Sequence, residues 1–283
     1  MAPGTLYSTE NQSKEGLQRV WHALLQEYMS RSLTFESDRL VAFAGIADLF
    51  QSHTQISPNS YLAGIWRHTL LQDLLWTISD GRKVSTPQKY RAPSWSWASV
   101  EPAPGVETIG SEFGSVSGGC ITLQGPLIKA CVSMKMIDLS DRLTKEQAVE
   151  FVSGGRLRYV ENHVSIPGFD EVPAMGNYTE NMSTKAQLDD LFPTVLVEQD
   201  IGVYLAVFYR RFNHDGSPIA HALVLVRGIE KAEFRRIGYV TMTRETIEPA
   251  AKDRDFGVYA ALTDEGDYLS VGDRPGIYNY RIV

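Results

Sequence analysis

The fold class is decided by Gly202-Val-Tyr-Leu-Ala-Val-Phe-Tyr-Arg-Arg-Phe212, Asn213-His-Asp-Gly216 and Ala220-His-Ala-Leu-Val-Leu-Val-Arg-Gly-Ile229. The first and last of these stretches are rich in β-branched and aromatic residues, which are typical of strands. The four residues between them include Asn, Asp and Gly, which favour the tight turn of a hairpin. This region therefore predicts two neighbouring antiparallel strands.

The same pattern of short apolar runs, separated by Gly, Pro, Asn and Asp, extends over most of the chain after residue 93. We expect further strands at 94–100, 120–126, 127–137, 156–160, 194–198, 234–242, 256–262 and 277–283. The polar segment 138–193 fits this pattern poorly. It predicts a long loop or lid with one short helix at 143–152.

The N-terminal third has the periodicity of helices instead. A first helix is indicated by an apolar stripe at helical spacing, formed by Leu17, Val20, Trp21, Leu24, Leu25 and Tyr28. A second helix is expected after Ser37, a good N-cap, with its inward side formed by Leu40, Val41, Ala44, Ala47 and Phe50. Gly45 in its middle is typical of close backbone packing. A third helix, from about Tyr61 to Ile78, is apolar on nearly all sides and is expected in the middle of a domain.

Helices followed by strands, without alternation, predict the α+β class. We expect a cap of about three helices over residues 1–92. It would pack on a β-rich body over residues 93–283, an antiparallel sheet or barrel, in one compact unit.

The composition of the 283 residues excludes several classes of function. Hydrophobic residues at 43% and charged residues at 22% indicate a globular chain, and the net charge of -7 argues against a nucleic-acid partner. No window approaches the roughly 20 apolar residues of a membrane helix, and the first 14 residues are polar, so a cytoplasmic protein is expected. Cys120 and Cys131 are expected to be buried free thiols.

Motifs for cofactors and metals are missing. The chain has no phosphate-binding loop with the usual glycine spacing and no grouping of Cys and His suited to zinc. We therefore expect neither a cofactor nor a metal ion.

The residues Tyr90-Arg-Ala-Pro-Ser-Trp-Ser-Trp-Ala-Ser-Val100 are the densest stretch of the sequence. In a strand, Trp95 and Trp97 point to the same face, where they line either the core or the wall of a ligand pocket. Arg91 would cap helix carbonyls or meet an anionic ligand. His68, on the expected third helix, is either a satisfied structural histidine or a general acid or hydrogen-bond donor in a pocket.

Several phrases of the chain resemble one known family, the fungal heterokaryon-incompatibility (HET) domain proteins, in the region that follows the HET domain. They are Trp21…Tyr28-Met-Ser-Arg-Ser-Leu-Thr34, Asp38-Arg-Leu-Val-Ala-Phe-Ala-Gly-Ile-Ala47, Tyr61-Leu-Ala-Gly-Ile-Trp66…Leu75-Trp76 and Tyr90-Arg-Ala-Pro-Ser-Trp-Ser-Trp-Ala-Ser99. Phe234-Arg-Arg-Ile-Gly-Tyr239 and Tyr280-Arg-Ile-Val283 resemble the β-rich tail of that family more weakly. The resemblance implies a fungal protein without the N-terminal HET domain, so the signalling output of that domain is not expected.

Two functions are compatible with these features. The first is a cofactor-independent cyclase, pericyclase or isomerase of fungal secondary metabolism, with an apolar or aromatic small-molecule substrate. Its pocket would be formed by Trp66, His68, Arg91, Trp95 and Trp97, with Tyr204 and Tyr209 contributed by a strand, and His68 would act in catalysis. The second is a non-catalytic, HET-related recognition or regulatory module that binds a protein partner through its β surface, with an exposed apolar patch and no enclosed cavity. A generic hydrolase or transferase has no positive support.

Overall fold

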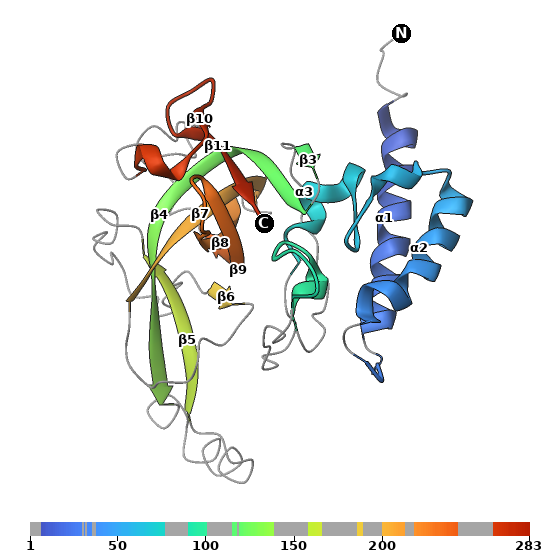
Figure 1. The fold of residues 1–283 in the computed structure, drawn as a ribbon, viewed down its shortest axis with the longest axis horizontal. Coiled ribbons are helices and arrows are strands. Elements are labelled where there is room, and N and C mark those ends of the chain that lie inside the picture. Colours follow the sequence, from blue (N-terminus) through green and yellow to red (C-terminus); the bar gives the residue numbers. More distant parts are fainter. Residues whose placement is uncertain are drawn as a thin grey trace. The chain divides into compact units, whose positions relative to one another are not determined.

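The fold was analysed in a computed structural model (Figure 1). The structure describes residues 7–29, 31, 33–35, 38–76, 90–100, 115–117, 119–138, 158–165, 186–188, 200–212, 218–242 and 263–283. Helices precede a mainly antiparallel sheet, so the chain has the α+β fold that the sequence predicts. None of the helices in the described ranges is both long and apolar enough to cross a membrane.

The chain divides into two compact units. The N-terminal unit comprises Met1–Leu123, Asp189–Leu191 and Arg281–Val283, and the C-terminal unit comprises Gln124–Leu188 and Phe192–Tyr280. The sequence places the change from helices to strands at residue 93, whereas the boundary between the units falls after Leu123.

The first two helices expected from the sequence are confirmed in the N-terminal unit. Helix α1 (Tyr7–Met29) and helix α2 (Arg39–Thr54) lie side by side in Figure 1. Their buried hydrophobic side chains are Trp21, Leu25 and Met29 from α1 and Phe43, Ala47 and Phe50 from α2. The spacing of three and four residues puts each set on one side of its helix.

Some residues predicted to face inward on α1 and α2 are exposed instead, so that part of the prediction is wrong. Val41 of α2 is 76% exposed, and Val20 and Leu24 of α1 are 52% and 37% exposed. Gly45 does not mark close packing within the chain, because no atom lies within 4 Å of the position that a Cβ would occupy there. Apolar residues thus occur on both the inner and the outer side of α2, and periodicity alone did not separate them.

The expected third helix from Tyr61 to Ile78 is also wrong. The turn η2 (Pro58–Ser60) is followed by a small antiparallel hairpin of β1 (Tyr61–Leu62) and β2 (Ile65–Trp66). Then come the single turn η3 (Arg67–Thr69) and the four-residue helix α3 (Leu70–Asp73). The cause is the pair between the strands, Ala63 and Gly64, whose φ angles of +45° and +96° make a two-residue turn.

The expected strand 94–100 is a tight turn that ends in η4 (Trp97–Ser99). Its serines compete with strand pairing by bonding to the main chain of their neighbours. Ser96 Oγ accepts from the Ala98 amide at 3.1 Å, and Ser99 Oγ donates to the Ser96 carbonyl at 2.7 Å. The Ser94 amide donates to the Val283 carbonyl at 3.1 Å, which holds the turn against the C-terminus.

The strands form one large sheet whose neighbours, in the order β10-β11-β4-β7-β8-β9-β6, are hydrogen-bonded, with β3 and β5 each paired to β4. Their bounds are β3 Ser115–Ser117, β4 Cys120–Asp138, β5 Arg158–Ser165, β6 Ala186–Leu188, β7 Asp200–Phe212, β8 Pro218–Arg227, β9 Glu233–Met242, β10 Ser270–Val271 and β11 Ile277–Ile282. A single turn, η7 (Glu265–Asp267), precedes β10. The expected strands 120–126 and 127–137 are one continuous, strongly curved strand, β4 (Figure 1).

The two antiparallel strands that decided the fold class are confirmed by the register of β7 and β8, whereas the expected turn at 213–216 lies outside the described residues. They pair antiparallel from Tyr204 opposite Leu225 to Phe212 opposite Pro218. Strand β9 pairs with β8 and also with β11, so that β11, β4, β7, β8 and β9 close into a ring. The segment 138–193 contains β5 and β6, and is therefore not one uninterrupted loop. The expected helix at 143–152 and the strands at 194–198 and 256–262 lie outside the described residues.

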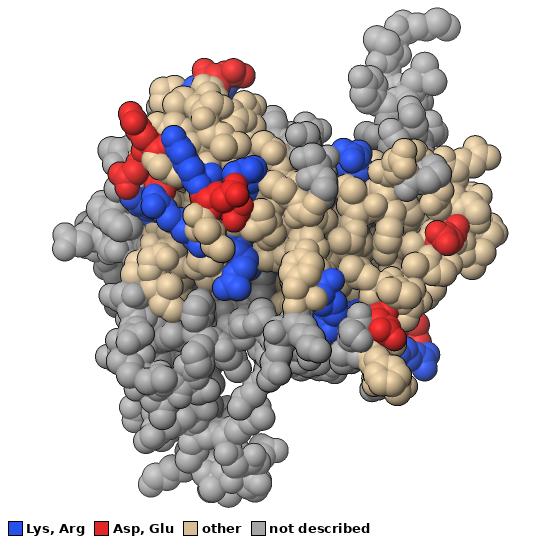
Figure 2. All heavy atoms as spheres, viewed as in Figure 1, with Lys and Arg blue, Asp and Glu red and all other residues tan. Residues whose placement is uncertain are grey.

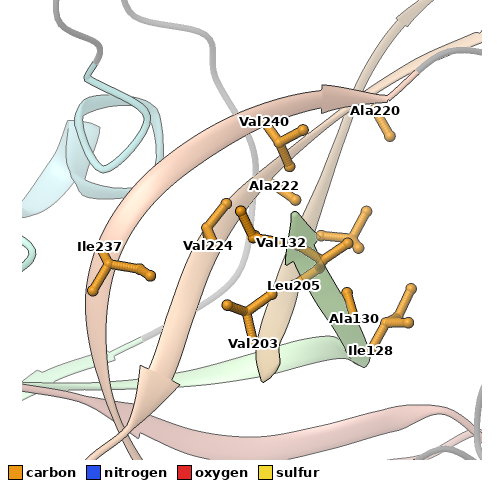
Figure 3. Close-up of a cluster of buried hydrophobic side chains, with 11 residues drawn as sticks. Ile128, Ala130, Val132, Val203, Leu205, Ala220, Ala222, Val224, Ile237 and Val240 are labelled. Carbon is orange, nitrogen blue, oxygen red and sulfur yellow. The ribbon is translucent and has the colours of Figure 1, made fainter. Parts of the chain in front are cut away.

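The core of the sheet is built from alternate residues of β4, β7 and β8 and from two residues of β9 (Figure 3). Its buried members are Ile128, Ala130, Val132, Val203, Leu205, Val207, Ala220, Ala222, Val224, Ile237 and Val240. The residues between them on β7 and β8 are buried as well, so both faces of these strands are covered from 203 to 208 and from 220 to 225. This explains why the two strands are continuous apolar runs rather than alternating ones.

Candidate functional site

The aromatic side chains of the N-terminal unit form one connected cluster. The ring centroid of Trp21 lies 5.1 Å from Phe43, 5.0 Å from Phe50 and 5.1 Å from Trp66. The Trp97 ring is 5.7 Å from Phe43 and nearly perpendicular to it, at 88°. Tilted and edge-to-face pairs at these distances are favourable. Trp66 and Trp97, expected in a pocket wall, are therefore packed against other rings.

The polar ends of the indoles of Trp95 and Trp97 bond to the main chain. Trp97 Nε1 donates to the Gly64 carbonyl and Trp95 Nε1 to the Gly119 carbonyl, each at 3.0 Å. Each side chain is only 1% exposed. A pocket-wall residue keeps one face clear of protein atoms, and this burial leaves none. Of the two interpretations offered by the sequence, the structure places both tryptophans in the core.

Arg91 has the capping role rather than contact with an anion. Its Nε donates to the Ala98 carbonyl at 2.6 Å and its Nη2 to the Val100 carbonyl at 2.8 Å. These carbonyls are at the end of η4, where the last main-chain acceptors of a helical turn need donors. The guanidinium therefore helps to hold the turn that carries the two tryptophans.

His68 lies in η3 and is exposed, so its expected position on a buried helix is wrong. Its ring is 6.4 Å from the ring of Trp66. Two buried polar atoms of the preceding hairpin, Trp66 Nε1 and the Tyr61 hydroxyl, have no hydrogen-bond partner among the described residues. Burial raises the pKa of Tyr61 far above its ordinary value.

A buried carboxylate that the sequence did not suggest ties α1 to α3. Asp73 Oδ1 lies 2.9 Å from His22 Nε2 and accepts from Gln18 Nε2 at 3.3 Å. Its other oxygen, Oδ2, accepts from the Thr69 hydroxyl at 2.6 Å. Because Thr69 donates to the carboxylate and not to His22, the group lacks the nucleophile-to-base bond of a catalytic triad. The arrangement fastens α1 to the segment after the hairpin.

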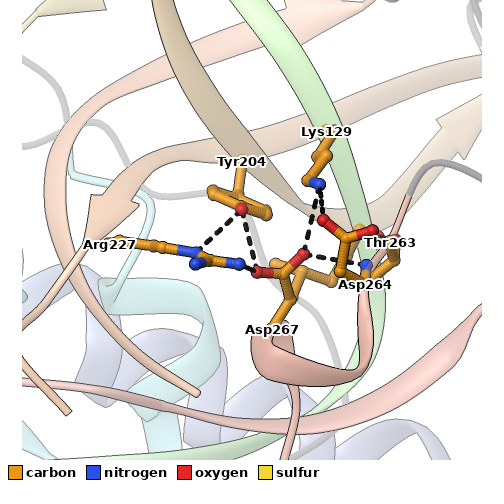
Figure 4. Close-up of polar contacts among 7 residues, drawn as sticks. Lys129, Tyr204, Arg227, Thr263, Asp264 and Asp267 are labelled. Atoms are coloured by element: carbon orange, nitrogen blue, oxygen red, sulfur yellow. Dashed lines mark hydrogen bonds and ion pairs between the residues drawn. The ribbon is translucent and has the colours of Figure 1, made fainter. Parts of the chain in front are cut away.

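Tyr204 belongs to a polar cluster of the C-terminal unit (Figure 4). Its hydroxyl donates to Asp267 Oδ1 at 2.8 Å and accepts from Arg227 Nε at 3.0 Å. Arg227 also donates to Asp267, and the Asp264 amide donates to Asp267 Oδ2 at 2.9 Å. Lys129 pairs with Asp264 and lies 3.7 Å from Asp267 Oδ2. The fully buried Asp267 carboxylate thus has hydrogen-bond or ion-pair partners on β4, β7 and β8 and in its own turn.

The charges of this cluster pair with one another. The hydrogen bond to Asp264 raises the pKa of Lys129, and the same contact lowers the pKa of Asp264. The hydrogen bond to Asp267 raises the pKa of Arg227, and burial, followed by the bond to Asp267, raises that of Tyr204. Lys129 and Arg227 already contact carboxylates, so the cluster stabilises the 264–267 turn and does not offer a site for an anion. Tyr209 lies in β7 opposite Ala220.

The surface feature that stands out in the N-terminal unit is the outward face of α2. We use that name for Val41, Ala42, Gly45 and Leu49, all exposed and opposite the buried Phe43, Ala47 and Phe50. Val41 is 76% and Leu49 61% exposed. Figure 2 shows few charged side chains over α1 and α2 in this view. Exposed aliphatic side chains gathered on one helix face are typical of interaction surfaces.

The sequence held a signal for this face that periodicity overlooked. Residues 40–47, Leu-Val-Ala-Phe-Ala-Gly-Ile-Ala, are apolar throughout, and one buried side of a helix cannot take up all of them.

Within the described ranges no group of three or more His, Cys, Asp or Glu residues is arranged to hold a metal ion. Cys120 and Cys131, expected to be buried, are half-buried and are not joined in a disulfide.

Comparisons with known proteins found no relative of this chain. No family model matches the chain, and neither a curated protein nor a solved structure matches it.

Proposed function

We propose that this chain is a non-catalytic recognition module that binds a protein partner through the outward face of α2. The observation that carries the proposal is the exposure of Val41 and Leu49 on a helix whose opposite side is already buried. A surface of this kind gains free energy when a partner removes it from water, at about 25 cal/mol per Å² of apolar area.

The aromatic residues support recognition over small-molecule catalysis. An enzyme that encloses an apolar substrate needs side chains that face a hollow, whereas Trp66, Trp95 and Trp97 are each 1% exposed. They contact neighbouring rings or main-chain carbonyls, and Arg91 is used in the same turn. No observation on these residues favours the cyclase, pericyclase or isomerase.

The surface proposed here differs from the β surface suggested by the sequence. Exposed aliphatic side chains occur in the C-terminal unit too: Ile229 lies alone in a turn, and Leu269 and Val271 lie two residues apart at the short strand β10. Scattered exposed hydrophobic residues are normal on any protein. The α2 face instead presents two of them, Val41 and Leu49, eight residues apart on one side of one rigid element.

The test is the native size of the tagged full chain in extracts of the cells that produce it, after a cross-linker applied to the intact cells has fixed weak complexes. We expect wild type to migrate well above the 31.6 kDa of one chain, and Leu49→Asp to migrate as a single chain. Leu269→Asp, which places the same charge at a 46% exposed leucine elsewhere, is expected to match wild type. A wild-type chain of single-chain size, or a Leu49→Asp chain unchanged in size, would contradict the proposal.

The enzyme has its own discriminating experiment. Deleting the gene and comparing small-molecule profiles would reveal a missing product if the chain made one. A product lost on deletion, but retained with Leu49→Asp, would support the enzyme and oppose the recognition role.

A further inference from the structure

The geometry of α2 points to a second copy of this chain as the partner: the outward faces of two α2 helices pack antiparallel and cross at Gly45. This inference rests on the proposed function, because it names what covers the same face. It commits to self-association, and binding of a different protein is one outcome of the test.

The spacing of the outward face makes it complementary to itself. Val41 precedes Gly45 by four residues and Leu49 follows it by four, so all three lie on one stripe of the helix. A two-fold axis at Gly45 brings Val41 of one protomer against the partner's Leu49, and the reverse. Self-complementarity of this kind is what a symmetric dimer interface requires.

Gly45 fits the centre of such a crossing. Apart from the surrounding backbone of α2 itself, nothing lies within 4 Å of the place where its Cβ would stand, so no packing contact within the chain requires glycine there. Glycine in the middle of a helix is unfavourable relative to alanine. Two helices that cross at glycine bring their backbones closer than any other residue permits, which gives this glycine a role.

Charge selects the antiparallel arrangement. Asp38, the N-cap of α2, and His53, in its last turn, are both exposed at opposite ends of the helix. The two-fold axis at Gly45 places Asp38 beside the partner's Ser52 and His53, where the helix dipoles are also opposed favourably. Asp48 then stands opposite the partner's Ala42 rather than the partner's Asp48. A parallel pair would set Asp38 against its own copy.

The size of the face limits the strength of the dimer. The 16 residues of α2 form a strip about 24 Å long and about 10 Å wide. The resulting area, about 240 Å² on each protomer, is well below the roughly 800 Å² of a standard stable interface. We therefore expect a weak, reversible dimer.

Sedimentation velocity of the purified full chain tests the inference over concentrations from about 5 to about 500 µM. Wild type should shift reversibly toward twice the mass of one chain. Gly45→Leu, which fills open space and leaves the fold intact, should weaken association at least about tenfold, as should Leu49→Asp. Leu269→Asp should associate as wild type does.

A second variant reports the geometry. Gly45→Cys in the full chain should form a disulfide between two copies under mild oxidation, because the axis places position 45 against itself. Ser52→Cys, on the same helix but away from the axis, should do so much less.

Three outcomes would overturn self-association: a chain that stays monomeric over the whole range, a dimer that Gly45→Leu leaves unchanged, or equal disulfide yields at positions 45 and 52. If the chain is monomeric alone but Leu49→Asp still reduces its native size in extracts, the face binds another protein. The proposed function then stands without this inference. If neither assay responds to Leu49→Asp, both are wrong.

Discussion

The indole of Trp97 packs against the backbone of Gly64 and bonds to it. Trp97 Nε1 donates to the Gly64 carbonyl at 3.0 Å, and a Cβ added to Gly64 would stand 2.4 Å from that same nitrogen. Gly64 also has a φ of +96°, which side chains rarely allow. The β1–β2 hairpin and the η4 turn, more than 30 residues apart in the chain, are therefore fitted to each other at this contact.

Gly64→Ala is expected to destabilise the protein by about 2–4 kcal/mol, because it adds both a clash with Trp97 and an unfavourable φ. Urea unfolding followed by tryptophan fluorescence measures the change. Gly45→Ala is the matched control: the space there is open, and alanine favours a helix by up to about 1 kcal/mol. Equal effects of the two substitutions would show that the contact with Trp97 is wrongly described.

Asp73→Ala is expected to destabilise the N-terminal unit by about 2–4 kcal/mol, because it leaves His22, Gln18 and Thr69 without the carboxylate they share. Asp48→Ala removes a carboxylate from an exposed position of α2 and should change the free energy of unfolding by less than about 0.5 kcal/mol. Chemical denaturation of both variants measures the difference. A small effect at Asp73 would contradict its role in holding α1.

Asp267→Asn should destabilise the C-terminal unit by about 2–3 kcal/mol, because a buried carboxylate that accepts from Tyr204 and Arg227 becomes an amide. Asp264→Asn keeps an acceptor at the exposed start of η7, and we expect a change below about 1 kcal/mol. Thermal and urea unfolding of the pair provide the comparison. The account of Figure 4 fails if Asp264→Asn is the more harmful of the two.

Alkaline unfolding should depend on Tyr280. Burial raises the pKa of Tyr280 well above its ordinary value of 10.0, so the folded protein holds this proton more tightly than the unfolded chain does. The stabilisation is complete below about pH 10 and is lost above it, at about 1.4 kcal/mol per pH unit for each such tyrosine.

Tyr280→Phe should reduce that slope of the unfolding free energy against pH. Tyr90→Phe, at a tyrosine that is 83% exposed, should leave the slope unchanged. Unfolding in urea between pH 9 and 11 is the measurement, with tyrosinate absorbance as a second signal. A slope unaffected by Tyr280→Phe would mean that its hydroxyl titrates normally in the folded protein.

The sequence predicted the long, uninterrupted elements. Helices α1 and α2 and strands β7 and β8 belong to this group, because local propensity and burial agree along them. The third helix failed because two residues, Ala63 and Gly64, turn an apolar run into a hairpin, and helical periodicity does not reveal a turn. The strand at 94–100 failed because Ser96 and Ser99 bond to nearby main-chain groups.

The candidate site was harder to predict for a related reason. Tryptophans in a core and tryptophans in a pocket wall have the same local sequence, and contacts such as Trp97 with Phe43 and Gly64 arise only from the tertiary fold. The capping role of Arg91 was one of two interpretations that its position before the turn allowed. The Asp73 contacts join α1 to a segment more than 50 residues away, which no local pattern encodes.

The most direct measurement of the central claim places a photo-cross-linking amino acid at position 49 of the full chain, in the cells that produce it. Irradiation should give a discrete protein adduct at position 49, with a yield at least about tenfold above that at position 269. Unlabelled chain added in excess should compete with this adduct, and unlabelled Leu49→Asp chain should not. Equal yields at the two positions, or no adduct at position 49, would contradict the claim that the outward face of α2 is a recognition surface.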